Sequence, residues 1–141
     1  MGRLFPEVRK QDDRRNHTVP YELQFEVLGD MLRVEIRGNR ANGDLSRNAK
    51  AAWSRIAAVC SENNLSRILV VSHATGKYRS YDAYEINSTL EECGLRKSWR
   101  IAFVNLDAES YEDIEFGETV AANRGFQLRV FPSEEVALAW L

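Results

Sequence analysis

The strongest constraint on the fold is an unbroken run of branched aliphatic residues, positions 68–71 (Ile-Leu-Val-Val), followed by a polar loop. A strand that is apolar on both sides is usually covered on both faces, as in the centre of a parallel sheet. The loop after it contains Gly76 and leads into a helical pattern at Asp82. Ligands and partners of open α/β sheets bind beyond the carboxyl ends of the strands, so we expect any site to lie in this region.

The rest of the chain divides into further strands separated by helical patterns. Two stretches around a Gly29-Asp30 turn alternate apolar with polar residues, which predicts a β-hairpin. Residues 100–105 and 126–131 are short apolar runs, and they predict two more buried strands. The inward positions of the hairpin are Leu23, Phe25, Val27, Leu32, Val34 and Ile36.

Apolar residues at helical spacing predict helices between and after these strands. Asp44 is the predicted N-cap of the first, because its carboxylate can accept from the free N–H groups of the first turn. The second helix is predicted from Asp82 to about Cys93, with Gly94 supplying the left-handed conformation past its end. Ser110 begins the third with a capping box, and a short C-terminal helix follows the last strand.

This order predicts one α/β domain with a mixed, mostly parallel five-stranded sheet that starts with an N-terminal β-hairpin. The element order is β-β-α-β-α-β-α-β-α, and strands that alternate with helices imply right-handed parallel crossovers. The domain is predicted to span residues 21–141, since a chain of 141 residues can bury one sizeable core. Residues 1–20 show no apolar periodicity and are predicted to be a flexible polar N-terminal arm.

Charge and cysteine content narrow the classes of function. The net charge of −2 argues against general nucleic-acid binding. Cys60 and Cys93 lie far apart and match neither a metal site nor a redox motif, so we expect no metal and no cofactor. The sequence has no recognisable signal peptide and no apolar run near 18 residues, which predicts a cytoplasmic protein without a membrane span.

No catalytic motif is recognisable, so the chain is expected not to be an enzyme. Gly76-Lys77 follows a strand as in a phosphate-binding loop, but Val71 occupies the position of the required first glycine. Ser72 and His73 are adjacent on a predicted strand, where neighbouring side chains point to opposite faces. They are therefore poorly placed to act together as nucleophile and base.

Charged residues gather at the predicted carboxyl edge of the sheet. Lys77 and Arg79 follow one buried strand, and Asp107 and Glu109 follow the next. Because parallel strands end at the same edge, we expect these acids to pair with these bases.

The closing segment, residues 123–141 (NRGFQLRVFPSEEVALAWL), and the order of the elements resemble the SpoIIAA-like proteins. These proteins belong with the STAS domains, the fold of bacterial anti-sigma-factor antagonists, and the resemblance covers residues 21–141. It implies a non-enzymatic regulatory or protein-interaction module whose partner is another protein. Such antagonists bind a partner kinase and are switched by phosphorylation of a serine at the start of the helix after the central strand.

The family motif at that serine is Asp-Ser-Ser-Gly, and the corresponding residues here are Arg79, Ser80, Tyr81 and Asp82, of which only Ser80 matches. The resemblance implies a phosphorylation or partner loop made of Ser80, Lys77, Arg79 and Tyr81. Capping of the following helix is the other role open to Ser80.

The alternative function is a carrier or sensor of a small apolar or lipid-like ligand, because SpoIIAA-like proteins have also been grouped with CRAL-TRIO lipid-transfer domains. The residues expected to face such a ligand are Ser72, His73, Tyr78 and Tyr84, with Tyr81, Tyr111 and Phe116 as further wall candidates. A closed core would favour protein interaction, and an apolar pocket of several hundred Å³ would favour ligand binding. A homodimer is left open.

Overall fold

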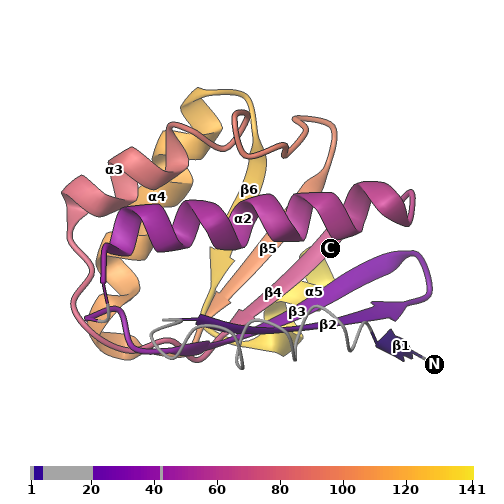
Figure 1. Cartoon of the computed structure of the whole chain (residues 1–141), viewed down its shortest axis with the longest axis horizontal. Helices are drawn as coiled ribbons and strands as arrows, with labels where there is room; N and C mark the ends of the chain where they lie inside the picture. The colour runs from indigo at the N-terminus through magenta and orange to yellow at the C-terminus, as the bar shows by residue number, and fades with distance from the viewer. Residues whose placement is uncertain (1, 5–20, 42) are drawn as a thin grey trace.

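A computed structural model describes residues 2–4, 21–41 and 43–141 of the chain, which form an α/β fold (Figure 1). The strands are β1 (Gly2–Leu4), β2 (Tyr21–Leu28), β3 (Met31–Gly38), β4 (Arg67–Ser72), β5 (Arg100–Asn105) and β6 (Gln127–Phe131). The helices are α2 (Leu45–Glu62), α3 (Ser80–Asn87), α4 (Tyr111–Asn123) and α5 (Glu134–Trp140), with a 3₁₀ turn, η1 (Ala108–Ser110), before α4.

The sheet is mixed and mostly parallel, as the sequence predicts. Its strands follow one another in chain order, β1-β2-β3-β4-β5-β6. The hairpin strands β2 and β3 pair antiparallel, and β3 to β6 pair in parallel. The predicted five strands are β2 to β6, and their order with the helices is the predicted β-β-α-β-α-β-α-β-α.

A short edge strand extends this sheet beyond the prediction. β1 pairs antiparallel with β2, with Gly2 opposite Leu28. With only three residues, this strand is too short to produce an apolar periodicity in the sequence. These residues fall in the predicted flexible arm, residues 1–20, whose other positions lie outside the described residues.

The central strand is buried on both faces. Ile68, Leu69 and Val70 have no exposed surface and Val71 is 3% exposed, while β3 and β5 flank the strand in parallel. This confirms the burial that the aliphatic run predicts, because side chains from both sides of the strand enter a core.

Two cores lie on the two faces of the sheet. The larger lies under α2, α3 and α4, and the parallel register aligns Ile68 with Ile101 and Val70 with Phe103 on this face. The smaller lies under α5, where Ala137 packs with side chains such as Val71 and Val104. Figure 1 shows α5 on the other side of the sheet from α2.

Helix ends follow local chemistry, with one clear difference from prediction. The carboxylate of Asp44 accepts a hydrogen bond from the backbone N–H of Arg47 at 3.2 Å, which confirms the predicted cap. α3 ends at Asn87 instead of continuing to Cys93. The hydroxyl of Thr89 donates to the carbonyl oxygens of Glu85 and Ile86 at 3.2 and 3.0 Å, and such back-bonding competes with helix propagation.

Trp140 fixes α5 to the smaller core. Its ring centroid lies 5.7 Å from that of Phe131 and 4.4 Å from the guanidinium carbon of Arg100. Arg100 Nη2 also donates to the carbonyl oxygen of Trp140 at 2.7 Å. The indole is therefore held by an aromatic neighbour and by a cation over its face.

We expect Trp140→Ala to lower the free energy of unfolding by about 2–3 kcal/mol, less than for a fully enclosed tryptophan because the side chain is only partly buried. Leu138→Ala on the same helix is the control, since Leu138 is 45% exposed and should change stability by less than about 0.5 kcal/mol. Urea unfolding measures both. Equal losses in the two variants would mean that α5 is not anchored through its indole.

Candidate functional site

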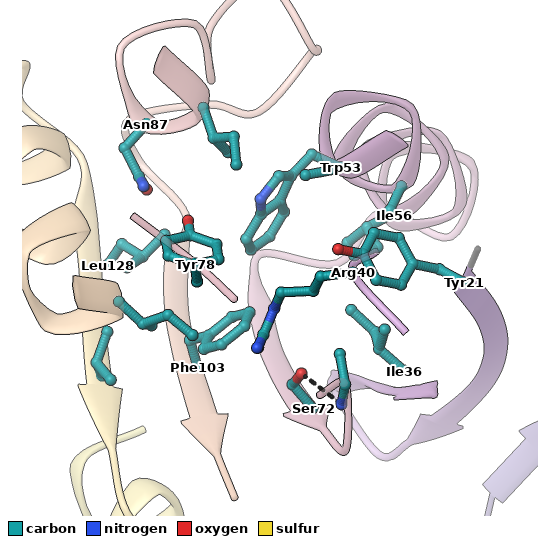
Figure 2. A pocket seen from close by; sticks show the side chains of 16 residues that line it. Tyr21, Ile36, Arg40, Trp53, Ile56, Ser72, Tyr78, Asn87, Phe103 and Leu128 are labelled. Carbon is teal, nitrogen blue, oxygen red and sulfur yellow. Dashed lines mark hydrogen bonds between the residues drawn. The ribbon is translucent and has the colours of Figure 1, made fainter. Parts of the chain in front are cut away.

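A cavity of about 70 Å³ lies between the sheet and the helices α2, α3 and α4 (Figure 2). Most of its wall is aliphatic or aromatic. The rings of Trp53 from α2 and Phe103 from β5 lie 6.1 Å apart at their centroids. The lining residues are Tyr21, Ile36, Arg40, Ala49, Ala52, Trp53, Ile56, Ser72, Ala74, Tyr78, Ile86, Asn87, Phe103, Ile114, Leu128 and Val130.

The cavity sits at the carboxyl ends of the parallel strands because the side chains become smaller there. On the face under α2, β4 carries the aliphatic Ile68 and Val70 and then Ser72, and Ala74 follows the strand. Ser72 and Ala74 are both buried, and both line the cavity. Small side chains in a row that elsewhere holds large ones leave unfilled space. The cavity therefore lies where open α/β sheets bind their ligands.

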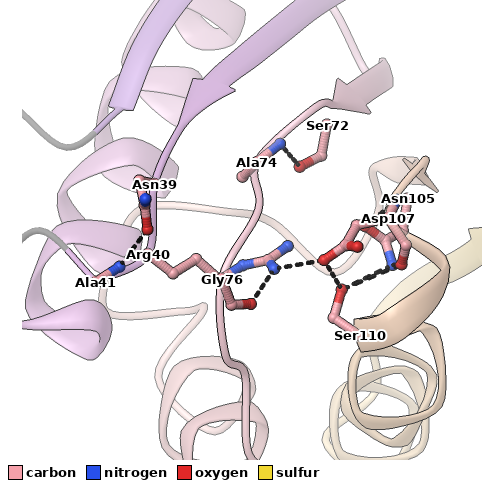
Figure 3. A network of polar contacts seen from close by, with 9 residues as sticks. All are labelled: Asn39, Arg40, Ala41, Ser72, Ala74, Gly76, Asn105, Asp107 and Ser110. Carbon is pink, nitrogen blue, oxygen red and sulfur yellow. Dashed lines mark hydrogen bonds and ion pairs between the residues drawn. The ribbon is translucent and has the colours of Figure 1, made fainter.

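The buried polar centre of the site is Arg40, which follows β3 in the chain. Its side chain is 3% exposed and lines the cavity. Nη1 donates to the carbonyl oxygen of Gly76 at 2.8 Å and to Oδ2 of Asp107 at 3.2 Å (Figure 3). Its guanidinium carbon lies 5.2 Å from the centroid of the Tyr78 ring. One side chain thus ties together the segments that follow β3, β4 and β5.

Asp107 is oriented by its own partners. The hydroxyl of Ser110 donates to Oδ2 of Asp107 at 3.0 Å. Nδ2 of Asn105 donates to the Ser110 hydroxyl at 3.2 Å and to the carbonyl oxygen of Asp107 at 3.0 Å. Ser110 precedes α4 but makes no side-chain cap, so the predicted capping box is wrong. Its hydroxyl holds the carboxylate that faces Arg40.

The two cavity tyrosines stay protonated at neutral pH. Burial raises the pKa of Tyr21 to about 12, and the nearby Arg40 only partly opposes this rise. Burial also raises the pKa of Tyr78, with a further contribution from Tyr21. Since Arg40 and Asp107 neutralise each other, the polar part of the cavity carries no net charge.

Asn87 forms the wall where α3 meets α4. Its Nδ2 donates to the carbonyl oxygen of Ala83 at 2.8 Å, and the residue is buried. A Cβ atom at Gly117 on α4 would overlap the Asn87 amide. The absence of a side chain at Gly117 is therefore what lets the two helices close around Asn87.

The four residues expected to face a ligand fall into two pairs in the structure, one that lines the cavity and one that lies outside it. Ser72 and Tyr78 line the cavity. His73 lies away from it, with Nε2 3.3 Å from Oε2 of Glu35. Tyr84 is 50% exposed, and the guanidinium of Arg124 lies 5.7 Å from its ring centroid.

The further wall candidates also lie outside the cavity lining. Tyr81 and Phe116 are exposed. Tyr111 packs against the larger core, and its hydroxyl donates to the carbonyl oxygen of Val130 at 3.4 Å. Within the described part of the chain, Tyr78 is the one tyrosine after β4 that lines the cavity.

The proposed partner loop is exposed throughout. Lys77, Arg79, Ser80 and Tyr81 all face solvent at the start of α3. Arg79 is the N-cap residue, and its backbone N–H donates to Oδ2 of Asp82 at 3.1 Å. Ser80 is the first helical residue, so it does not cap the helix.

Arg40 is the principal site residue that the sequence patterns did not identify. Asp107 was expected to pair with Lys77 or Arg79, and it pairs with Arg40. The available signal was position: Arg40 and Asp107 each follow the end of a predicted strand, at the same edge of a parallel sheet. The loop between Gly38 and Gly43 offered no periodicity to show which of its side chains turns inward.

Other classes of site find no support among the described residues. Within residues 2–4, 21–41 and 43–141, no cluster of three or more histidine, cysteine or acidic side chains could hold a metal ion. In the same part of the chain, no helix has both the length and the apolar content needed to cross a bilayer. The chain matches no family model, no curated protein and no solved structure.

We expect Gly117→Ala to lower the free energy of unfolding by about 1–3 kcal/mol, because the added methyl group overlaps the Asn87 amide. In an unconstrained helix the same change would instead stabilise by about 1 kcal/mol. The double variant with Asn87→Ala is the control, since it removes the overlapping group and should restore part of the loss. A stabilised Gly117→Ala protein would contradict the close approach of α3 and α4.

Proposed function

We propose that this chain is a non-enzymatic binding module that holds a small, largely apolar molecule in the cavity under α2, α3 and α4. The observation that carries the proposal is the cavity itself, an apolar space at the carboxyl edge of the sheet with one buried guanidinium in its wall. A mostly apolar pocket with a few convergent polar groups is the usual form of a small-molecule site.

The size of the cavity limits the ligand. A volume of about 70 Å³ is about half that of the roughly 150 Å³ cavity that holds benzene, a molecule of six non-hydrogen atoms. Pockets for drug-sized or lipid-like molecules measure about 300–1,000 Å³. The proposal is therefore narrower than a lipid carrier: a molecule of about three or four non-hydrogen atoms.

The chemistry of the wall favours binding over turnover. A general acid or base works best with a pKa near the operating pH. The pKa of Tyr21 is about 12 and that of Tyr78 is raised as well, so both hydroxyls remain protonated. The carboxylate of Asp107 is already engaged by Arg40 and Ser110.

We expect 2-methylpropane or acetone, each with four non-hydrogen atoms, to bind with about millimolar affinity. The readout is the indole N–H resonance of Trp53, which lines the cavity, with the resonance of Trp140 as an internal reference on the other face of the sheet. The matched variant is Ala52→Leu, whose larger side chain fills part of the cavity and should abolish the response. If neither compound gives a saturable shift at Trp53, the cavity is not a binding site.

Protein interaction is the second candidate, and α3 provides the observation in its favour. Its outer side presents Tyr81 and Tyr84, which are 68% and 50% exposed, while Ile86 and Asn87 on the same helix line the cavity. Exposed tyrosines are common anchors in protein interfaces. A partner bound to α3 would thus contact the element that closes the cavity.

A serine switch on this helix has a direct test. Ser80→Asp should release in pull-downs a protein that Ser80→Ala retains, because only the aspartate carries the negative charge of a phosphate. The melting temperatures of both variants should match the parent, since Ser80 is exposed and is not the cap residue. Equal recovery of proteins by the two variants would exclude the switch, and a further loss only in Tyr81→Ala would assign the interaction to the tyrosine face.

A further inference from the structure

Arg40 has unused hydrogen-bonding capacity that faces the cavity. A guanidinium carries five N–H donors. Within the described part of the chain, its hydrogen bonds to Gly76 and Asp107 both start at Nη1. A further side-chain hydrogen bond joins Arg40 to the Tyr21 hydroxyl, so two of the five donors remain, and Figure 2 shows the side chain reaching past Tyr21 toward Phe103.

These remaining donors have accessible surface. Among the described side chains, the buried polar atoms without any hydrogen-bond partner are Ser46 Oγ and Arg100 Nε. Arg40 is not among them although its side chain is 3% exposed, because the nitrogen bonded to Tyr21 has a partner and the remaining nitrogen has accessible surface. The space that its free nitrogens meet is therefore the cavity that Arg40 lines.

The charge balance decides what Arg40 can hold. Its positive charge is already neutralised by Asp107, and Asp107 is kept in place by the Ser110 hydroxyl at 3.0 Å. A ligand carboxylate would bring a second negative charge to one cation in an apolar enclosure, where an unpaired charge is strongly disfavoured. A hydrocarbon would leave the remaining guanidinium donors without an acceptor, which is also unfavourable.

We propose that the cavity is specific for a small neutral molecule that carries one hydrogen-bond acceptor, such as a carbonyl oxygen, which takes a hydrogen bond from Nε or Nη2 of Arg40. The apolar part of the molecule lies against Trp53 and Phe103. This inference rests on the proposed function, and it adds the chemical class of the ligand and the residue that recognises it.

The first test compares three probes of four non-hydrogen atoms: acetone, 2-methylpropane and acetate. Binding to the full chain is followed by the indole N–H shift of Trp53, with Trp140 as the reference. We expect acetone to bind at least about tenfold more tightly than acetate, because only the ketone preserves the neutrality of the site. A carboxylate that binds as tightly as the ketone, or more tightly, would overturn the inference.

The second test assigns the hydrogen bond to Arg40. Removing Arg40 alone would strand the Asp107 carboxylate, so the test variant is the neutral pair Arg40→Met with Asp107→Asn. We expect its acetone affinity to fall about tenfold relative to its 2-methylpropane affinity. Arg40→Lys, which keeps the charge but loses the planar fork, provides a second variant if the pair does not fold, and it should lower the same ratio.

The outcomes separate the inference from the proposed function. If 2-methylpropane binds and the relative affinity for acetone is unchanged in the variants, the cavity is a site but Arg40 does not recognise the ligand. If neither the ketone nor the hydrocarbon shifts Trp53 in the parent chain, the proposed function fails and the inference fails with it. A ketone preference that is lost in the variants supports both.

Discussion

The ion pair between Arg40 and Asp107 is the interaction on which the carboxyl edge of this sheet depends. Both partners are largely removed from water, and a buried cation that loses its partner is strongly destabilising. The same guanidinium nitrogen binds the carbonyl oxygen of Gly76, so the segments after β3, β4 and β5 share one charge-assisted centre. Ser110 completes it by holding the carboxylate from the start of α4. The polar network therefore sets the positions of the segments from which the cavity opens.

The cavity is a consequence of how the two rows of core side chains end. Apolar rows run along β4 and β5 up to Val70 and Phe103. Beyond them the sheet presents Ser72, and the polar network takes the place of a further apolar layer. Empty space remains there because the side chains of Ser72 and Ala74 are small and fill only part of the volume between the sheet and the helices. The cavity and its polar centre thus arise from the same change in side-chain size.

α3 connects this interior space to the surface. One side of this short helix closes the cavity with Ile86 and Asn87, and the other presents Tyr81 and Tyr84 to solvent. Its close fit against α4 depends on Gly117, which leaves room for Asn87. A ligand that moves Asn87 would therefore act on the helix that carries the exposed tyrosines, which gives ligand binding and protein interaction a common element.

The sequence by itself determined the features that depend on local periodicity. The aliphatic run of β4, the alternation of the hairpin and the cap at Asp44 each depend on a few neighbouring positions, so the α/β class and the order of the elements along the chain follow from such local patterns. Only the tertiary structure decided the partner of Arg40, because Asp107 lies 67 positions away and Lys77 and Arg79 were equally good candidates in the sequence. It also decided the edge strand β1. A cavity is a mismatch of volumes among distant side chains, and no local pattern encodes that mismatch.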